Sequence, residues 1–233
     1  MGSLNAPTVL NSSLFIAQFW DGRARNLTEQ APGPIHNPVE MDSNWDEVIA
    51  KLSADKAFTS RFKKTYPQGI TEEAIVDALV SYESALITVN SPFDRYLCGD
   101  DEAISSDALE GYKLFKSIGC ISCHQGQAVG GNMFQEFGIM GDYFIQFDKT
   151  SDADKGRINV TSRGVDLHRF KVPSLRNVEL TAPYFHNGNT SSLDEAIRVM
   201  AEYQLGESVT DESVGLIESF LHSLTGVVAE ELR

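Results

Sequence analysis

The sequence predicts an all-α protein, and two observations lead to this fold class. Apolar residues recur every three or four positions in several segments, which is the spacing of one face of a helix. No strand-rich region and no internal repeat stands out along the chain. With 233 residues, the chain is long enough for one large domain or two small ones.

Composition narrows the possible functions. The chain carries 33 acidic and 19 basic side chains, and its formal net charge is −14 at pH 7. This charge argues against nucleic-acid binding and favours a basic or dipolar protein partner. No apolar run approaches the roughly 20 residues that a membrane-spanning helix needs. We therefore expect neither a nucleic-acid partner nor a membrane span.

A motif near the middle of the chain indicates a covalently bound cofactor. Two cysteines separated by two residues and followed by histidine (CISCH, 120–124) form the CxxCH attachment pattern of c-type haem. The thiols of Cys120 and Cys123 would bond to the haem, and His124 would be the proximal iron ligand. A redox disulfide and half a zinc site are the alternatives. Haem attachment is favoured, because Cys98 is the only other cysteine and no βαβ pattern surrounds the motif.

Two helices are expected in the first half of the chain, after a Pro- and Gly-rich segment of irregular structure with a short helix. The first covers residues 45–52, where apolar side chains recur at helical spacing. The second covers 71–89, with Thr71 as its N-cap. Asn90-Ser91-Pro92 should end this helix, and residues 93–104 read as a linker.

Three further helices are expected in the second half. A helix capped by Ser105 or Ser106 leads directly into the CxxCH motif. The pair Ser192 and Glu195 has the spacing of a capping box at the start of the next helix. Thr210 caps the last helix, which is amphipathic and bears acidic residues in its first turn.

These elements predict two domains. With the haem motif near its start and an amphipathic helix at its end, the segment 103–228 has the layout of a small cytochrome c domain. Residues 4–102 would form a second, partial and mostly helical domain. Residues 1–3 read as an expression scar, not an export signal, so we expect a fragment without its natural N-terminus. Because c-type haem is attached outside the bacterial cytoplasm, we expect a periplasmic protein.

The sixth ligand of the haem iron is the next question. Methionine in this position raises the redox potential and suits electron transfer. Met200 lies on a separate helix and could reach the other face of the haem more easily than Met133 or Met140 in the loop after His124. Met200 is therefore the first candidate, Met140 the second and an upstream histidine the third. The alternative for each methionine is a gap-filling place in the core.

Three basic side chains flank the segment that follows this loop. They are Arg169, Lys171 and Arg176. One or two of them could pair with the haem propionates, and solvated surface is the alternative of equal weight.

Several long segments carry a resemblance to a known family. They are NAPTVLN (5–11), QFWDGRA (18–24), EQA (29–31), NPVEM (37–41), GCISCH (119–124), VPSLRN (172–177), TAPYFH (181–186) and QLG (204–206). In these segments the chain resembles the bacterial di-haem cytochrome c peroxidases and their relatives, the methylamine-dehydrogenase maturation enzymes. The resemblance spans residues 5–226 and implies two cytochrome c-like domains.

The resemblance implies roles for the haem-site residues. The family has a low-potential peroxidatic haem and a high-potential electron-transfer haem, and Cys120, Cys123 and His124 match the set of the second. Met200 matches the axial methionine of that haem. Because a tyrosine stands there in the maturation enzymes, Met200 argues for the peroxidase branch. Trp20 resembles the tryptophan between the two haems.

The resemblance also implies a peroxide pocket and a calcium site. Gln30 and Glu40 match the pair that lines the pocket, where Glu40 would be the general acid–base for O–O cleavage. The alternative for Glu40 is a carboxylate before the start of a helix. Asn5 and the backbone carbonyls of Thr181 and Pro183 match the calcium ligands between the domains.

Taken as the resemblance implies, the chain is part of a periplasmic cytochrome c peroxidase. The enzyme would be a homodimer that reduces hydrogen peroxide to water with electrons from a small cytochrome c or a cupredoxin. The family's first CxxCH would precede Asn5 and is not in this sequence, so we expect one covalent haem and an inactive fragment. A mono-haem electron carrier without catalysis is the alternative, and an oxidative maturation enzyme is the third possibility.

Overall fold

The computed structural model describes residues 2, 4–146 and 150–232. Helices predominate in this part of the chain, as expected. A small antiparallel sheet, which the sequence analysis did not predict, pairs β1 (Phe134–Glu136) with β2 (Arg169–Lys171). None of the described helices is long and apolar enough to cross a membrane.

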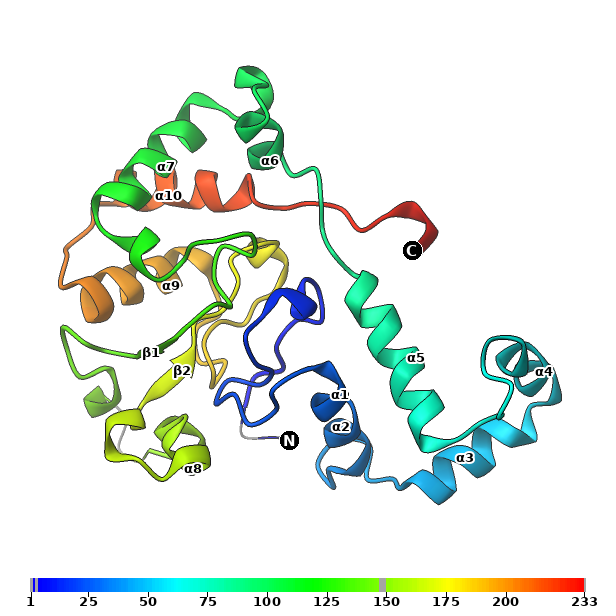
Figure 1. The fold of residues 1–233 in the computed structure, drawn as a ribbon. Coiled ribbons are helices and arrows are strands. Elements are labelled where there is room, and N and C mark those ends of the chain that lie inside the picture. The colour runs from blue at the N-terminus through cyan, green and yellow to red at the C-terminus, as the bar shows by residue number, and fades with distance from the viewer. Residues whose placement is uncertain (1, 3, 147–149, 233) are drawn as a thin grey trace.

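Five helices follow one another in the first half of the chain and gather on one side of the molecule (Figure 1). They are α1 (Leu27–Gln30), α2 (Pro32–His36), α3 (Trp45–Ala54), α4 (Lys56–Thr65) and α5 (Glu72–Ala85). The expected helices over 45–52 and 71–89 correspond to α3 and α5. The expected cap of α5 is confirmed, because Thr71 Oγ1 accepts a hydrogen bond of 3.2 Å from the Ala74 N–H.

The expected linker over 93–104 is wrong in its first part, because it begins with the helix α6 (Pro92–Leu97). Asn90-Ser91-Pro92 lies between two helices, and Pro92 takes the first helical position, where a missing N–H costs nothing. Ser91 and Asp94 close a capping box, with side chain-to-backbone hydrogen bonds of 3.1 and 3.0 Å. Helix α5 already ends at Ala85, so Ser91 and Pro92 start α6 and do not end α5 as expected.

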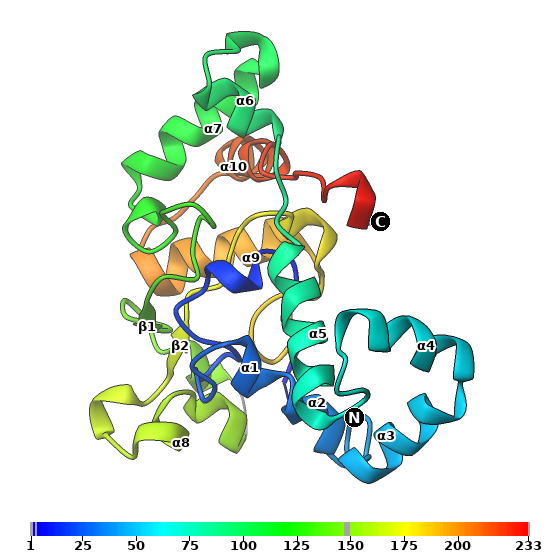
Figure 2. The same cartoon turned by 45° about the vertical axis from the view of Figure 1, so that its right-hand side comes forward.

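Two helices that lie side by side hold the haem motif in place (Figures 1 and 2). They are α7 (Ser106–Ser117), which leads into the motif, and α10 (Asp211–His222), near the end of the chain. The two helices approach closely at Gly111. A Cβ atom added there would lie 1.9 Å from the carbonyl oxygen of Leu216. Of the two expected caps of α7, Ser105 is the one used, and Thr210 caps α10 as expected.

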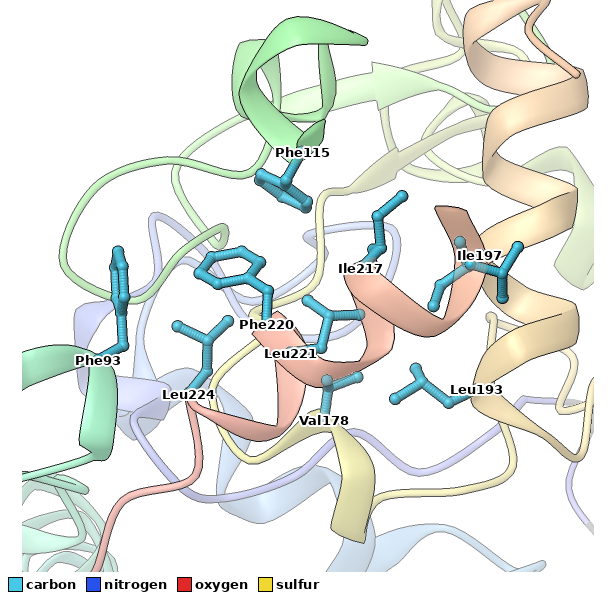
Figure 3. Close-up of a cluster of buried hydrophobic side chains, with 10 residues drawn as sticks. Phe93, Phe115, Val178, Leu193, Ile197, Ile217, Phe220, Leu221 and Leu224 are labelled. Carbon is cyan, nitrogen blue, oxygen red and sulfur yellow. The ribbon is translucent and has the colours of Figure 1, made fainter. Parts of the chain in front are cut away.

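The main hydrophobic core lies around α10 (Figure 3). Side chains converge on it from α6, from α7, from the segment before α9 (Leu193–Val199) and from α9 itself. They are Phe93, Phe115, Val178, Leu193, Ile197, Ile217, Phe220, Leu221 and Leu224. Since Phe93 belongs to α6, this core draws in a helix from before residue 103, and the expected boundary between residues 102 and 103 stays a prediction.

The long Gly-rich loop 125–165 contains β1 and, towards its end, the short helix α8 (Ile158–Thr161). After β2 the chain reaches α9, which begins at the expected place. However, the capping box expected there is not formed, because the Ser192 side chain makes no capping hydrogen bond. Helix α9 continues into a π-helical turn, Met200–Leu205.

The N-terminal segment packs against the second half of the chain. The Asn5 N–H donates to the His186 carbonyl (2.7 Å), and the Ile16 N–H donates to the Gly131 carbonyl (2.9 Å). The Trp20 carbonyl accepts from the N–H of Lys171 in β2 at 2.8 Å. Residues 5–20 therefore form part of the wall around the site described next.

Candidate cofactor site

The residues expected to bind haem line one cavity. Cys120, Cys123 and His124 reach it from the turn after α7, and Met200 reaches it from the end of α9. The cavity holds ≈ 1710 Å³ of open space with its mouth included, and most of its other lining side chains are apolar. A largely apolar cavity with a few converging polar groups is the usual form of a cofactor site.

A short 3₁₀ turn, Cys120–Ser122, presents the motif to the cavity. Gly119 precedes it in a left-handed conformation (φ +103°), which a residue without Cβ adopts at little cost. The N–H groups of Cys123 and His124 then donate to the Cys120 carbonyl at 3.2 and 3.0 Å. These bonds hold two sulfur atoms and one imidazole in a fixed relation.

The electrostatic surroundings keep these groups neutral. Burial, and to a smaller extent the nearby Cys123, raises the pKa of Cys120 to about 11. Burial also raises the pKa of Cys123, and both thiols are free. Burial lowers the pKa of His124 to about 4. The imidazole is therefore neutral at pH 7, as a metal ligand must be.

The imidazole of His124 has one enclosed nitrogen. Its Nδ1 is buried and has no hydrogen-bond partner, although the carbonyl groups of Val129 and Pro173 lie close enough to oppose the fall in pKa. A metal-binding histidine usually turns its other ring nitrogen towards a carbonyl group, and the backbone groups of Val129 and Pro173 lie near the imidazole.

Met200 is half-buried and begins the π-helical turn. Such turns are rare and occur often at functional sites. Gln204 in the same turn bonds to two backbone groups around β1, the Gly138 N–H and the Glu136 carbonyl, both at 3.0 Å. Among the described residues that line the cavity, Met200 is the only methionine, and Met140 is 62% exposed.

These groups fit a covalently bound haem. The thiols are free, the imidazole is neutral, a thioether sulfur lies on the same cavity, and the walls are apolar. Cys98 is exposed and lies outside the lining. Among the residues described, no cluster of three or more His, Cys, Asp or Glu side chains could hold a metal ion. The ligand roles of His124 and Met200 stay predictions.

Trp20 also lines this cavity, and its indole Nε1–H donates to the Asn5 carbonyl at 2.9 Å. Its ring meets the imidazole of His186 edge to face, with 6.4 Å between centroids. His186 is 1% exposed, and its Nε2 lies 2.7 Å from Asp154 Oδ1. The sequence analysis did not find this buried pair, because residues 32 positions apart leave no spacing signal.

The expected peroxide-pocket residues lie elsewhere. Glu40 is exposed and lines a second pocket beside Arg23 and Glu29, and its Oε1 accepts a hydrogen bond of 2.7 Å from Asn37. Gln30 ends α1 and does not line that pocket. Of the two expected residues, the structure thus brings only Glu40 to the wall of this pocket.

The expected calcium ligands are close together. Asn5 Nδ2 donates to the Pro183 carbonyl at 2.7 Å and to the Phe185 carbonyl at 3.2 Å. Thr181 lies on the same cavity wall. A calcium ion needs oxygen ligands, so the amide of Asn5 would have to turn over to offer Oδ1 in place of Nδ2.

Comparison with known proteins points to one family. The family model described as di-haem cytochrome c peroxidase matches residues 1–102. The chain is 48% identical to the cytochrome c peroxidase Ccp of Escherichia coli K12 over 228 residues, which are 97% of this chain and 49% of that protein. It is 44% identical to the cytochrome c551 peroxidase of Nitrosomonas europaea, over 97% of this chain and 66% of that protein. The chain thus spans about half to two thirds of these relatives.

A solved structure shows the same fold. A MauG-like protein associated with microbial copper homeostasis superposes with a TM-score of 0.86 at 21% identity, over 99% of this chain and 78% of that one. The expected fold, mostly helical and cytochrome c-like, is confirmed by this likeness.

Proposed function

Because this chain belongs to the di-haem cytochrome c peroxidase family, we propose that it carries the electron-transfer haem of a cytochrome c peroxidase. The observation that carries the proposal is that Cys120, Cys123, His124 and Met200 line one cavity. When bound, the haem would supply an iron that accepts and releases one electron at a time.

The residues of the chain would hold that group and set its properties. The two thiols fix it covalently to the short turn after α7, and the neutral His124 binds from a fixed orientation. The sulfur of Met200 favours the reduced metal and so raises the potential. An apolar wall excludes water and adds to this effect. Such a site is suited to accept electrons from a donor protein.

The whole enzyme would reduce hydrogen peroxide, with two electrons and two protons giving two molecules of water. Glu40 would take a proton from one peroxide oxygen and deliver it to the other, which leaves as water. Its place on a pocket wall, held by Asn37, supports this role. Gln30 would orient the peroxide from α1. Trp20, on the wall of the haem cavity, would lie on the electron path between the two parts of the enzyme.

Further features of the proposal concern partners and location. The electron donor would be a small cytochrome c or a cupredoxin, the enzyme would be a periplasmic homodimer, and the chain itself would bind one covalent haem. Asn5 and the carbonyls of Thr181 and Pro183 would bind calcium after the amide of Asn5 turns over.

The first experiment tests the haem and its ligands. The pyridine haemochrome assay should give one covalent haem per chain, and the oxidised spectrum should show the sulfur-to-iron band of Met–His ligation. Met200→Ala should abolish this band and lower the midpoint potential while the haem stays attached. Met140→Ala, at an exposed methionine outside the cavity, is the control and should change neither. A band that survives in Met200→Ala contradicts the ligand assignment.

The second experiment tests the reaction in the whole peroxidase that contains this chain. Peroxide-dependent oxidation of a reduced small cytochrome should be fast, and Glu40→Gln should lower kcat by about 10²–10⁴-fold. Glu47→Gln is the control, since this carboxylate at the start of α3 lies outside the pocket. Absence of turnover in the whole protein would favour the electron-carrier alternative.

A further inference from the structure

Lys171 is a buried lysine. It ends β2, its backbone N–H donates to the Trp20 carbonyl at 2.8 Å, and the residue is 5% exposed. Lysine is almost never fully buried unless its charge is paired, because an ammonium group out of water loses its hydration. The position therefore calls for an anion.

No side chain of the described residues supplies that anion. The ammonium lies over the ring of Phe15, 4.2 Å from its centroid, and it makes no hydrogen bond or ion pair with any residue that the structure describes. Burial alone, with no carboxylate in opposition, lowers the pKa of Lys171 to about 8. An aromatic face attracts a cation but does not replace a carboxylate.

The side chain lies on the wall of the haem cavity. Among the described residues of that wall, only Glu136 carries a carboxylate, and it is exposed and not paired with Lys171. The other titratable side chains of the wall, apart from the two thiols and the tyrosine, are His124 and His186, which burial keeps neutral. Within the described part of the chain, this leaves the occupant of the cavity as the source of negative charge.

Neither of the other two basic residues of this region fills the role, each for a different reason. Arg176 uses both terminal nitrogens on Asp94, at 3.0 and 2.8 Å. Arg169 is half-buried and is not part of the cavity wall. Of the three basic residues, Lys171 is therefore the one that both lines the cavity and has no ion-pair partner among the described residues.

We propose that Lys171 forms an ion pair with a propionate carboxylate of the haem that Cys120 and Cys123 hold. This inference rests on the proposed haem and adds a residue that recognises its carboxylate edge. A charge-assisted N–H···O bond in an apolar site is strong and directional. It would keep that propionate ionised inside an apolar cavity and give the buried ammonium its counter-charge.

The test follows the propionates directly. The protein is produced with haem labelled with carbon-13 at the propionate carboxyl groups, and NMR of the reduced form follows their ionisation against pH. In the wild type, one propionate should stay ionised to a pH below the ordinary carboxyl pKa of about 4.3. In Lys171→Met, this propionate should titrate at a pH at least about one unit higher, because it has lost its cation.

Two further variants control for charge and location. Lys171→Arg keeps the cation, so the propionate should titrate close to its pH in the wild type. Lys116→Met removes a lysine that also lies over an aromatic ring, Tyr112 at 4.0 Å, but is exposed and outside the cavity, and it should leave both propionates unchanged.

The outcomes separate this inference from the proposed function. Absence of covalent labelled haem in the wild type overturns both. Labelled haem whose propionates all titrate as ordinary carboxyl groups in the wild type overturns the ion pair alone, even if Lys171→Met fails to fold. An equal shift in Lys171→Met and Lys116→Met also overturns it, because any loss of positive charge would then suffice.

Discussion

Asp94 is a single residue that joins two parts of the fold. It completes the capping box of α6 and accepts both terminal nitrogens of Arg176 from the segment after β2. Burial alone would raise the pKa of Asp94, but the hydrogen bonds from Arg176 and Ser91 outweigh it and hold the pKa below its usual value. The ionised form is therefore the one that stabilises the fold.

We expect Asp94→Asn to lower the free energy of unfolding by about 2 kcal/mol at pH 7, since it leaves a mostly buried guanidinium without its anion. Because the folded-state pKa is depressed, this contribution is complete above the unfolded value of about 3.9 and is lost as the pH falls through the folded value. Urea unfolding at pH 7, 5 and 3 measures the difference between wild type and variant, which should be constant to pH 5 and shrink at pH 3.

The control for this pair is Asp211→Asn. Asp211 also binds an arginine, Arg198, at 2.7 Å, but its side chain is 96% exposed. Water screens such a pair, so the loss should be about 0.5 kcal/mol or less. Equal losses in the two variants, or a loss at Asp94 that persists unchanged at pH 3, would show that the ion pair is not the source.

At this scale, sequence predicts residues whose chemistry requires a fixed spacing. Cys120, Cys123 and His124 are found in this way because one turn must place all three. Lys171 is only one of three equal candidates and His186 escapes, because nothing in their neighbours tells a buried cation or imidazole from an exposed one. Their burial depends on Phe15 and Asp154, residues that are distant in the chain.

At the scale of elements, the contact between α7 and α10 sets the position of the haem motif. Gly111→Ala would place a methyl group 1.9 Å from the Leu216 carbonyl and force the helices apart. We expect the free energy of unfolding, measured with urea, to fall by about 1–3 kcal/mol. The haem spectrum should also shift, because α7 leads directly into Cys120.

Gly215→Ala is the matched control on α10. Gly215 is exposed, and an added Cβ there would meet nothing within 4 Å. Alanine in an exposed helix interior should stabilise the protein by about 0.5–1 kcal/mol. If Gly111→Ala left the free energy of unfolding unchanged, the two helices would be able to move apart without loss of stability.

The elements also show where sequence reasoning fails. Long helices with a polar cap and an apolar stripe, such as α5 and α10, are predicted because their signals are local. Ser91-Pro92 is ambiguous, since it is read equally well as a helix end or a helix start, and α6 was missed for this reason. The strands β1 and β2 have three residues each, too few for an alternating pattern.

For the whole molecule, the sequence predicts the fold class but not how the helices and loops are arranged in space. Residues 5–20 complete the wall of a cavity whose haem motif lies about a hundred positions away, through bonds such as that between Asn5 and the Pro183 carbonyl. At the other end, the Val227 N–H pairs with the Val89 carbonyl after α5. Such contacts depend on how helices pack, which periodicity does not encode. The resemblance in segments 5–11 and 181–186 was the only sequence sign that these two parts belong together.

The whole chain also has one electrostatic property with a measurable consequence. Its net charge of −14 should attract a basic donor over a distance of a Debye length, about 10 Å at 0.1 M salt. In the whole peroxidase, we expect the rate constant for reduction by a basic cytochrome c to fall by about tenfold or more between roughly 10 mM and 300 mM salt. Stopped-flow mixing at several ionic strengths measures this rate.

An acidic cupredoxin of similar size is the control, because salt should leave its rate unchanged or raise it by screening repulsion. The electron-transfer step itself is intramolecular once the donor is bound, so its limiting rate at saturating donor should not depend on salt. If the basic and acidic donors showed the same salt dependence, the acidic surface would have no part in donor selection. Recognition would then have to rest on an apolar contact around the haem cavity.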